Sequence, residues 1–108
     1  MLTDEKQVEA AVEYLRSSVG EAAQARANRL YLEQFLKSKR AVLMVSAPAG
    51  SVAAQEVFAL AHPDYLAVLD GYKAAVEHDE TFRFKREAAS ARIEAYKTAS
   101  FMERALKL

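Results

Sequence analysis

Residues 63–106 read PDYLAVLDGYKAAVEHDETFRFKREAASARIEAYKTASFMERAL. This stretch predicts one long helix, because His62-Pro63-Asp64 is a favourable start and no proline interrupts the residues after Pro63. Proline at the first helical position gives up no hydrogen bond that the helix needs, and Asp64 faces the positive end of the helix dipole. At a rise of about 1.5 Å per residue, such a helix is about 66 Å long.

An apolar stripe runs along this predicted helix. Its residues succeed one another mostly at spacings of three or four, which is typical of an amphipathic helix. They are Tyr65, Leu69, Tyr72, Val76, Phe82, Ala89, Ile93 and Tyr96. A helix of this length cannot bury its own stripe, so the sequence predicts a partner helix of similar length.

The first part of the chain predicts that partner, a second long helix over residues 3–46. Thr3 suits the N-cap position, with acidic residues in the first turn. Gly20 is its weakest point and is interpreted either as a kink or as a break that leaves residues 3–18 as a separate helix. The apolar positions are Val8, Ala11, Val12, Leu15, Val19, Ala22, Ala23, Ala27, Leu30, Tyr31, Phe35 and Leu36.

The segment Ser46-Ala47-Pro48-Ala49-Gly50 predicts a loop, since proline cannot extend a helix and glycine favours turns. Ser51 can then cap a short helix over residues 52–61, whose Val57, Phe58 and Leu60 are expected to cover the end of the hairpin. The predicted fold class is therefore all-α. Residues 1–108 form a single domain, an antiparallel hairpin of long helices (3–46 and 63–106) with a short cross-over helix, expected to assemble into a bundle or coiled coil.

Composition excludes several classes of function. Fifteen basic and fifteen acidic residues cancel, so no strong field attracts nucleic acid. Cysteine is absent, which removes disulfides and thiolate chemistry. The charged start has no apolar signal segment, and the longest apolar run, residues 41–45, is too short to span a bilayer. These features predict a soluble cytoplasmic protein.

Metal and catalytic sites are not expected. His62 and His78 are too far apart for two ligands on one helical face. Glu77 and Glu80 have the E-x-x-E spacing of helical magnesium-dependent nucleotide pyrophosphohydrolases, but the region that should face them carries arginines where a second acidic pair is needed. No serine has a nearby histidine to activate it. We therefore expect no enzymatic activity, no metal and no cofactor.

Two basic clusters are candidates for weak contact with single-stranded nucleic acid. The first is formed by Lys37, Lys39 and Arg40, and the second by Arg83, Lys85 and Arg86. Neighbouring aromatic side chains could stack on bases. Because the chain is neutral, any such binding should be weak and sensitive to salt. The alternative is that these residues form a solvated helix face.

The antiparallel register predicts a polar layer in the middle of the hairpin. If facing positions sum to about 109, Arg26 and Arg29 lie opposite Arg83 and Glu80, with Asp79 one position away. We expect Arg29, and with it Arg26, to pair with one of these carboxylates and so fix the register. The alternative is that the arginines point outward and bind a partner.

The same register places Val19 opposite Ala89 and Ser90. A hairpin of only two helices leaves part of its apolar surface uncovered. This uncovered surface predicts self-association as a homodimer. The residues concerned are Tyr14, Leu15, Tyr31, Leu32, Phe82, Phe84, Tyr96 and Phe101.

Three stretches resemble a group of small helical proteins of tailed bacteriophages and prophages. They are residues 21–27 (EAAQARA), 61–66 (AHPDYL) and 91–96 (ARIEAY). The resemblance runs over residues 14–100, except that the group often has tryptophan where Tyr96 stands and an asparagine-rich end where this chain has residues 101–104.

Members of that group are often encoded beside single-strand annealing recombinases, exonucleases and single-strand DNA-binding proteins. The resemblance implies a setting in the host bacterial cytoplasm and a protein partner in phage DNA recombination or replication. An inhibitor that docks on a host enzyme is the alternative, and a weak single-strand nucleic-acid binder is another.

Overall fold

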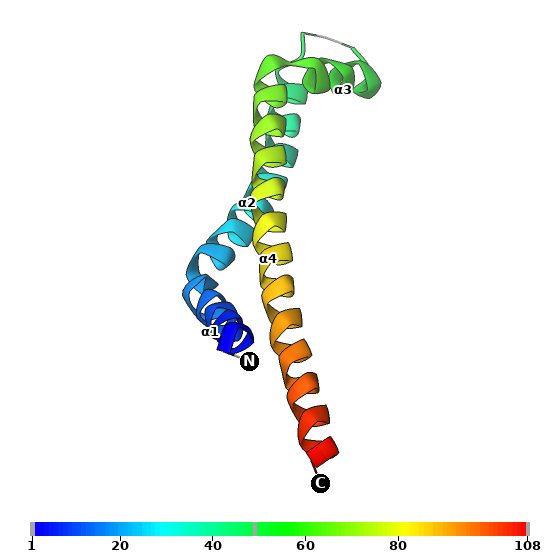
Figure 1. Cartoon of the computed structure of the whole chain (residues 1–108). Helices are drawn as coiled ribbons and strands as arrows, with labels where there is room; N and C mark the ends of the chain where they lie inside the picture. The colour runs from blue at the N-terminus through cyan, green and yellow to red at the C-terminus, as the bar shows by residue number, and fades with distance from the viewer. Residues whose placement is uncertain (1, 49, 108) are drawn as a thin grey trace. The chain divides into compact units, whose positions relative to one another are not determined.

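The computed structural model describes residues 2–48 and 50–107, and the side chains of Leu2 and Thr3 lie outside the description. Its elements are four helices: α1 (Leu2–Ser17), α2 (Val19–Val45), α3 (Val52–Ala61) and α4 (Pro63–Lys107) (Figure 1). This confirms the all-α class and the helical hairpin with a short cross-over helix. Ala49 of the predicted loop lies outside the described residues, as does the predicted capping group of Thr3.

The chain divides into two compact units. The first consists of Met1–Ala23 with Glu80–Leu108, so that α1 and the start of α2 pack against the second half of α4. The second is Gln24–Asp79, in which the rest of α2 packs against the first half of α4 and α3 connects the two. Both α2 and α4 therefore contribute to each unit.

Of the two alternatives at Gly20, the structure has the break that leaves a separate first helix, since α1 ends at Ser17 and α2 begins at Val19. The break lies at Ser18, so Gly20, the expected weak point, is the second residue of α2. Helical bonds continue on both sides of the break, from Ser18 N–H to the Tyr14 oxygen (3.0 Å) and from Ala22 N–H to the Ser18 oxygen (2.9 Å).

A side chain from α4 contacts the break. Arg86 Nη1 donates to the Leu15 carbonyl oxygen at 2.8 Å. An uninterrupted helix would offer this carbonyl to the N–H of Val19, and insertion of a side chain into the ladder of helix bonds is a known origin of kinks. The break therefore coincides with a tertiary contact at Leu15 and Ser18.

Two capping residues define the tip of the second unit. Ser51 caps α3 as predicted, since its Oγ accepts from the Ala54 N–H at 3.2 Å. His62 then serves two helices: its N–H donates to the Ala59 oxygen (3.2 Å) at the end of α3, and its Nδ1 accepts from the Asp64 N–H (3.0 Å) at the start of α4. The sequence pattern placed His62 at the start of the long helix but did not predict that it also caps the end of α3.

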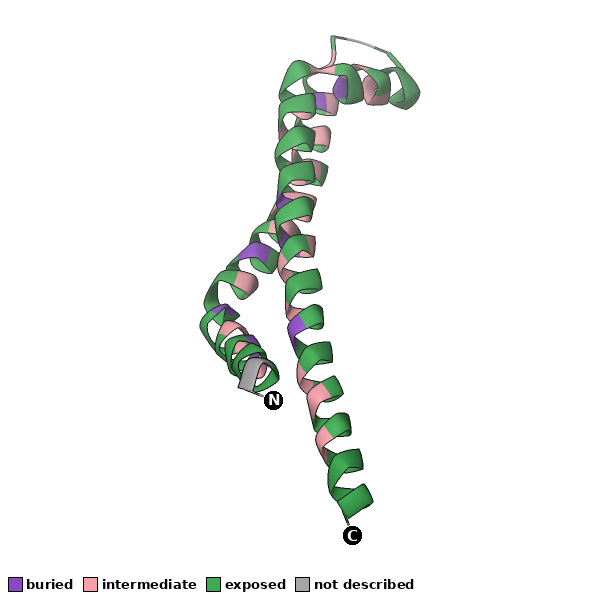
Figure 2. Ribbon diagram, in the orientation of Figure 1, coloured by how far each residue is buried: buried purple, intermediate pink, exposed green. Residues whose placement is uncertain are grey.

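The less exposed side of α4 has an alternating spacing of three and four residues, and we call it the inner seam of α4. This differs from the predicted stripe, because Val68 belongs to it, whereas Leu69 is 39% exposed. Figure 2 shows its buried and half-buried positions along the helix. The seam comprises Tyr65, Val68, Tyr72, Ala75, Asp79, Phe82, Arg86, Ala89, Ile93, Tyr96 and Ser100.

The helices before the turn carry a matching seam with the same spacing. In the first unit it comprises Val8, Ala11, Leu15, Ser18 and Ala22. In the second unit it comprises Ala25, Arg29, Leu32, Leu36, Lys39 and Leu43, which we call the inner seam of α2. A heptad spacing of this kind keeps one side of a helix facing its neighbour.

The core enclosed by these seams is thin. Among the described residues, the buried apolar side chains are Ala11, Ala25, Leu43, Ala59, Ala75 and Ala89. Alanines let the helix backbones approach closely, but each buries little area. Most of the large apolar side chains therefore lie outside the core.

Candidate interaction surfaces

The inner seams of the second unit contain an ion pair. Arg29 Nη1 lies 3.2 Å from Asp79 Oδ2, and Asp79 is 9% exposed. The two residue numbers sum to 108, close to the predicted 109. Arg26 is exposed and makes no ion pair with any described residue, so the expected second arginine does not join the layer. Glu80 forms an ion pair with Arg83.

The first unit has a polar layer that the sequence did not predict. Arg86 Nη1 donates to Ser18 Oγ at 2.6 Å as well as to the Leu15 oxygen. Ser18 is buried, at 7% exposure. A serine two residues before a glycine indicates a weak helix position, and nothing in its neighbourhood signals an arginine sixty-eight residues away.

This layer also corrects the expected contact of Val19 with Ala89 and Ser90. Val19 is 54% exposed. Ala89 instead lines a hollow together with Ala11 and Tyr14. The register sum of 109 therefore does not extend through residues 1–23 and 80–107.

Four of the six residues in the two basic clusters have intramolecular partners. Lys39 pairs with Asp64 (3.9 Å) and Arg40 with Glu56, while Arg86 bonds to the Leu15 oxygen and Ser18 as described. Lys37 and Lys85 are exposed and make no ion pair with a described residue. The two clusters therefore present less unpaired positive charge for binding phosphate groups than the sequence suggests.

Arg83, the fourth of these residues, is the centre of an exposed network on α4. Its Nε lies 2.6 Å from Glu80 Oε2 and its Nη1 lies 3.1 Å from Glu87 Oε1. Its guanidinium also covers the Phe84 ring, 4.5 Å from the ring centroid. The hydrogen bond to Glu80 raises the pKa of Arg83 above its ordinary value. Exposed pairs of this kind contribute little to stability.

The described side chains contain no group of three or more histidine, aspartate or glutamate residues placed to hold a metal ion. Glu77 of the E-x-x-E pair is exposed, and its partner Glu80 faces Arg83. Among the described helices, none combines the length and apolar character that crossing a bilayer requires.

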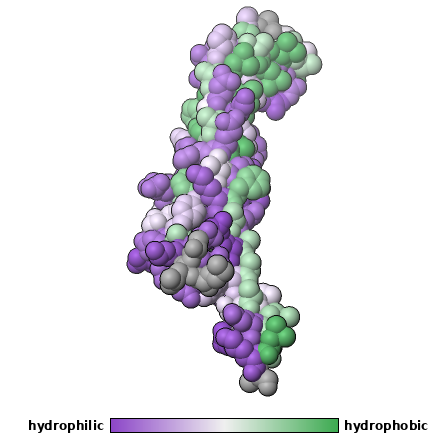
Figure 3. Space-filling view, in the orientation of Figure 1, coloured by the Kyte–Doolittle hydropathy of each residue, from purple (hydrophilic) through white to green (hydrophobic). Residues whose placement is uncertain are grey.

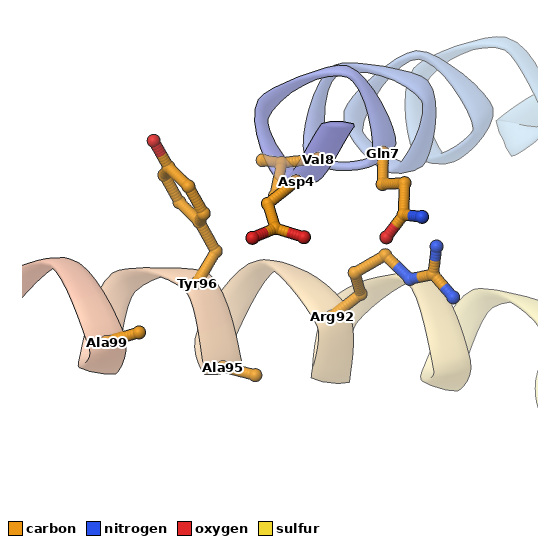
Figure 4. Close-up of a pocket in the computed structure, with 7 residues that line it drawn as sticks. All are labelled: Asp4, Gln7, Val8, Arg92, Ala95, Tyr96 and Ala99. Carbon is orange, nitrogen blue, oxygen red and sulfur yellow. The ribbon is translucent and has the colours of Figure 1, made fainter. Parts of the chain in front are cut away.

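Two adjoining hollows lie between α1 and α4 in the first unit. One has a volume of about 240 Å³ and is bordered by Asp4, Gln7, Arg92 and Tyr96 among others (Figure 4). The other, of about 260 Å³, shares Gln7 and Arg92 and is otherwise lined mainly by alanines. Small side chains on both helices create these hollows, and they are open to solvent.

The residues predicted to drive self-association divide into two groups. Tyr31, Phe84 and Phe101 are 64%, 57% and 69% exposed. The other five are half-buried within their units: Tyr14, Leu15, Leu32, Phe82 and Tyr96.

A hydrophobic patch covers the tip of the second unit. Figure 3 shows hydrophobic residues gathered over α3. Val52 is 70% exposed, Val57 68% and Leu60 43%, and these three residues define the tip patch. The sequence predicted that Val57, Phe58 and Leu60 would cover the hairpin end, but Val57 and Leu60 are exposed, whereas Phe58 is half-buried.

Comparisons of the chain with protein-family models, with curated proteins and with solved structures return no match.

Proposed function

We propose that this chain is a non-enzymatic protein–protein interaction module, an accessory factor in phage DNA recombination or replication that works as a homodimer in the host bacterial cytoplasm. The observation that carries the proposal is the contrast between core and surface. Among the residues whose side chains the structure describes, the buried apolar ones are five alanines and one leucine, whereas sixteen large apolar side chains are exposed. Surfaces of this kind are typical of proteins whose apolar area is covered by partners.

The tip patch is the surface we assign to the phage partner protein. It lies on a short helix capped at both ends, by Ser51 and by His62, so its side chains are presented on a fixed backbone. Preorganised apolar groups lose little conformational entropy on binding. The stretches that resemble phage proteins encoded beside recombination genes supply the setting.

Affinity purification of the tagged chain from phage-infected cells tests the proposal. We expect a phage recombination or replication protein to be recovered with the natural chain and lost with Val57→Glu. Val12→Glu is the matched control, since Val12 is an exposed valine on α1, at 49% exposure. Recovery of only membrane or virion-shell components would overturn the proposal. Recovery of a host enzyme instead would replace the accessory role with that of an inhibitor.

A further inference from the structure

A second seam runs along α2, on a different side of the helix from the inner seam. It consists of Tyr31, Phe35, Ser38, Val42 and Val45, and we call it the outer seam. The spacing between its members is four, three, four and three residues, the same heptad alternation as in the inner seam. Its apolar members are 64%, 40%, 62% and 88% exposed in chain order. All five lie within the second unit.

The two seams of α2 point in directions about 100–120° apart. Each residue of an α-helix is rotated by about 100° from the previous one, and Leu32 of the inner seam directly follows Tyr31 of the outer seam. Likewise Leu36 follows Phe35, and Leu43 follows Val42. A helix with two such seams is patterned to pack against two neighbouring helices. The first half of α4 lies against the inner seam.

The accessible surface of the chain is large enough for a substantial interface. It measures 7993 Å², whereas a monomeric protein of this mass exposes about 6,000 Å². A standard interface buries about 800 Å² on each partner. A second copy that covers the outer seam would therefore remove part of this surplus from water.

We propose that the outer seam binds the outer seam of a second copy in antiparallel orientation, with the two-fold axis at Ser38. The inference rests on the proposed function and deepens it by naming the occupant and register of this surface. Because the seam is centred on Ser38, the antiparallel arrangement places Tyr31 opposite Val45 of the partner subunit and Phe35 near Val42 of the partner subunit.

This arrangement matches large side chains to small ones along the whole contact. Tyr31 and Phe35 stack on each other with their centroids 6.0 Å apart, so one end of the seam is aromatic. The other end carries only valines. A parallel pairing would crowd four aromatic rings at one end and leave gaps at the other, whereas alternation of large and small residues fills an interface evenly. The Ser38 hydroxyls meet at the centre and can hydrogen-bond to each other.

Sedimentation equilibrium of the full chain at tens of micromolar tests the occupant. The natural chain should be a dimer, and Val42→Glu should raise the dissociation constant by more than about tenfold, because it places a carboxylate in an apolar contact. Val57→Glu in the tip patch should leave the dimer intact. A monomeric natural chain, or a dimer that Val42→Glu does not weaken, would overturn the inference.

Cysteine cross-linking tests the register. The chain has no cysteine of its own, so introduced thiols report only on the chosen positions, and a disulfide needs Cα atoms about 4.4–6.8 Å apart. Under mild oxidation, Ser38→Cys should form dimers, as should the double variant Tyr31→Cys/Val45→Cys. Val45→Cys alone should not. Efficient cross-linking of Val45→Cys alone would exclude the antiparallel arrangement.

These results are separable from the fate of the proposed function. Loss of the phage partner with Val57→Glu, together with a monomeric natural chain, would support the interaction with a partner protein and remove the homodimer together with its seam. If the natural chain forms a dimer that Val42→Glu weakens but recovers no phage protein, the dimer seam would be supported and the interaction with a phage protein would be removed.

Discussion

Each of the two units holds an arginine in its inner seam, and the two arginines are satisfied in different ways. In the second unit Arg29 faces the carboxylate of Asp79. In the first, Arg86 faces neutral acceptors, the Ser18 hydroxyl and the Leu15 carbonyl. A seam can therefore hold a cation either beside a counter-charge or beside a carbonyl that a helix break makes available. The first solution leaves both helices intact, and the second is coupled to the break between α1 and α2.

The largest expected effect is at the charged layer. Asp79→Ala should lower the free energy of unfolding by about 3 kcal/mol, at the low end for buried pairs because Arg29 is about a third exposed. Arg29→Ala should cost at least as much, since it removes the counter-charge of the Asp79 carboxylate, whose side chain is only 13% exposed. Urea denaturation at one fixed protein concentration measures both.

The double variant Arg29→Ala/Asp79→Ala decides whether the two residues are coupled. Its loss should be smaller than the sum of the single losses. Asp70→Ala, an exposed aspartate on the same helix, is the control and should change stability by less than about 0.5 kcal/mol. Strictly additive losses would mean that the pair contributes nothing.

Removal of the neutral layer of Arg86, Ser18 and Leu15 should lower the free energy of unfolding by less, and it should also change the helix bonds at the break. Arg86→Ala should cost about 2 kcal/mol, because the buried Ser18 hydroxyl and the Leu15 carbonyl lose a charged donor. The released carbonyl can then accept the N–H of Val19, so amide exchange at Val19 should slow relative to the rest of the helix. Exchange measured by NMR tests this directly.

The matched control is Lys85→Ala, which removes an exposed cation from the neighbouring position. It should affect neither stability nor the exchange of Val19. If Arg86→Ala destabilised the chain while Val19 exchanged as before, the side chain would not be the cause of the break.

The smallest expected change in the free energy of unfolding comes from substituting the helical glycines, of which each unit contains one. A Cβ added at Gly71 or at Gly20 would meet nothing within 4 Å. Gly71→Ala, inside α4, should raise the free energy of unfolding by up to about 1 kcal/mol, and Gly20→Ala, close to the start of α2, by less. Equal gains at both positions would show that the break leaves α2 as rigid near its start as α4 is in its interior.

Gly50→Ala is the contrasting substitution for this series. Its backbone has φ 117°, and an added Cβ would lie 2.9 Å from the Ala54 Cβ. It should destabilise the turn, which thermal unfolding would report as a lower Tm. A gain in stability would mean that the turn accommodates a side chain.

Local chemistry made most of the fold predictable. Pro63, Ser51 and the loop before it lie in sequence beside the helix ends that they define, and each acts through its own backbone or first turn. The pairing of Arg29 with Asp79 could also be predicted from the sequence. Each of these residues interrupts the apolar stripe of its own helix, and the antiparallel register makes the two interruptions face each other.

The features that sequence reasoning missed depend on contacts between distant residues. A break near Gly20 was one of the two sequence alternatives, but its contact with Arg86 was not predicted, because glycine has the weaker intrinsic helix propensity and drew attention to Gly20 instead of Ser18. The outer seam was hidden for a different reason. Its residues and those of the inner seam alternate along α2, so the sequence suggested one broad apolar stripe. The structure distinguishes two seams, because one is buried or half-buried and the other is exposed.

The alternating spacing of the α4 seam also constrains how this chain can change in length. One residue inserted after Gly71 would rotate every later position by about 100° and carry Asp79 and Arg86 out of the seam together. Seven inserted residues would return the seam to within about 20° of its direction. Related chains should therefore tolerate insertions of any size between Ser46 and Ser51, but in the helical arms they should gain or lose residues in steps of seven.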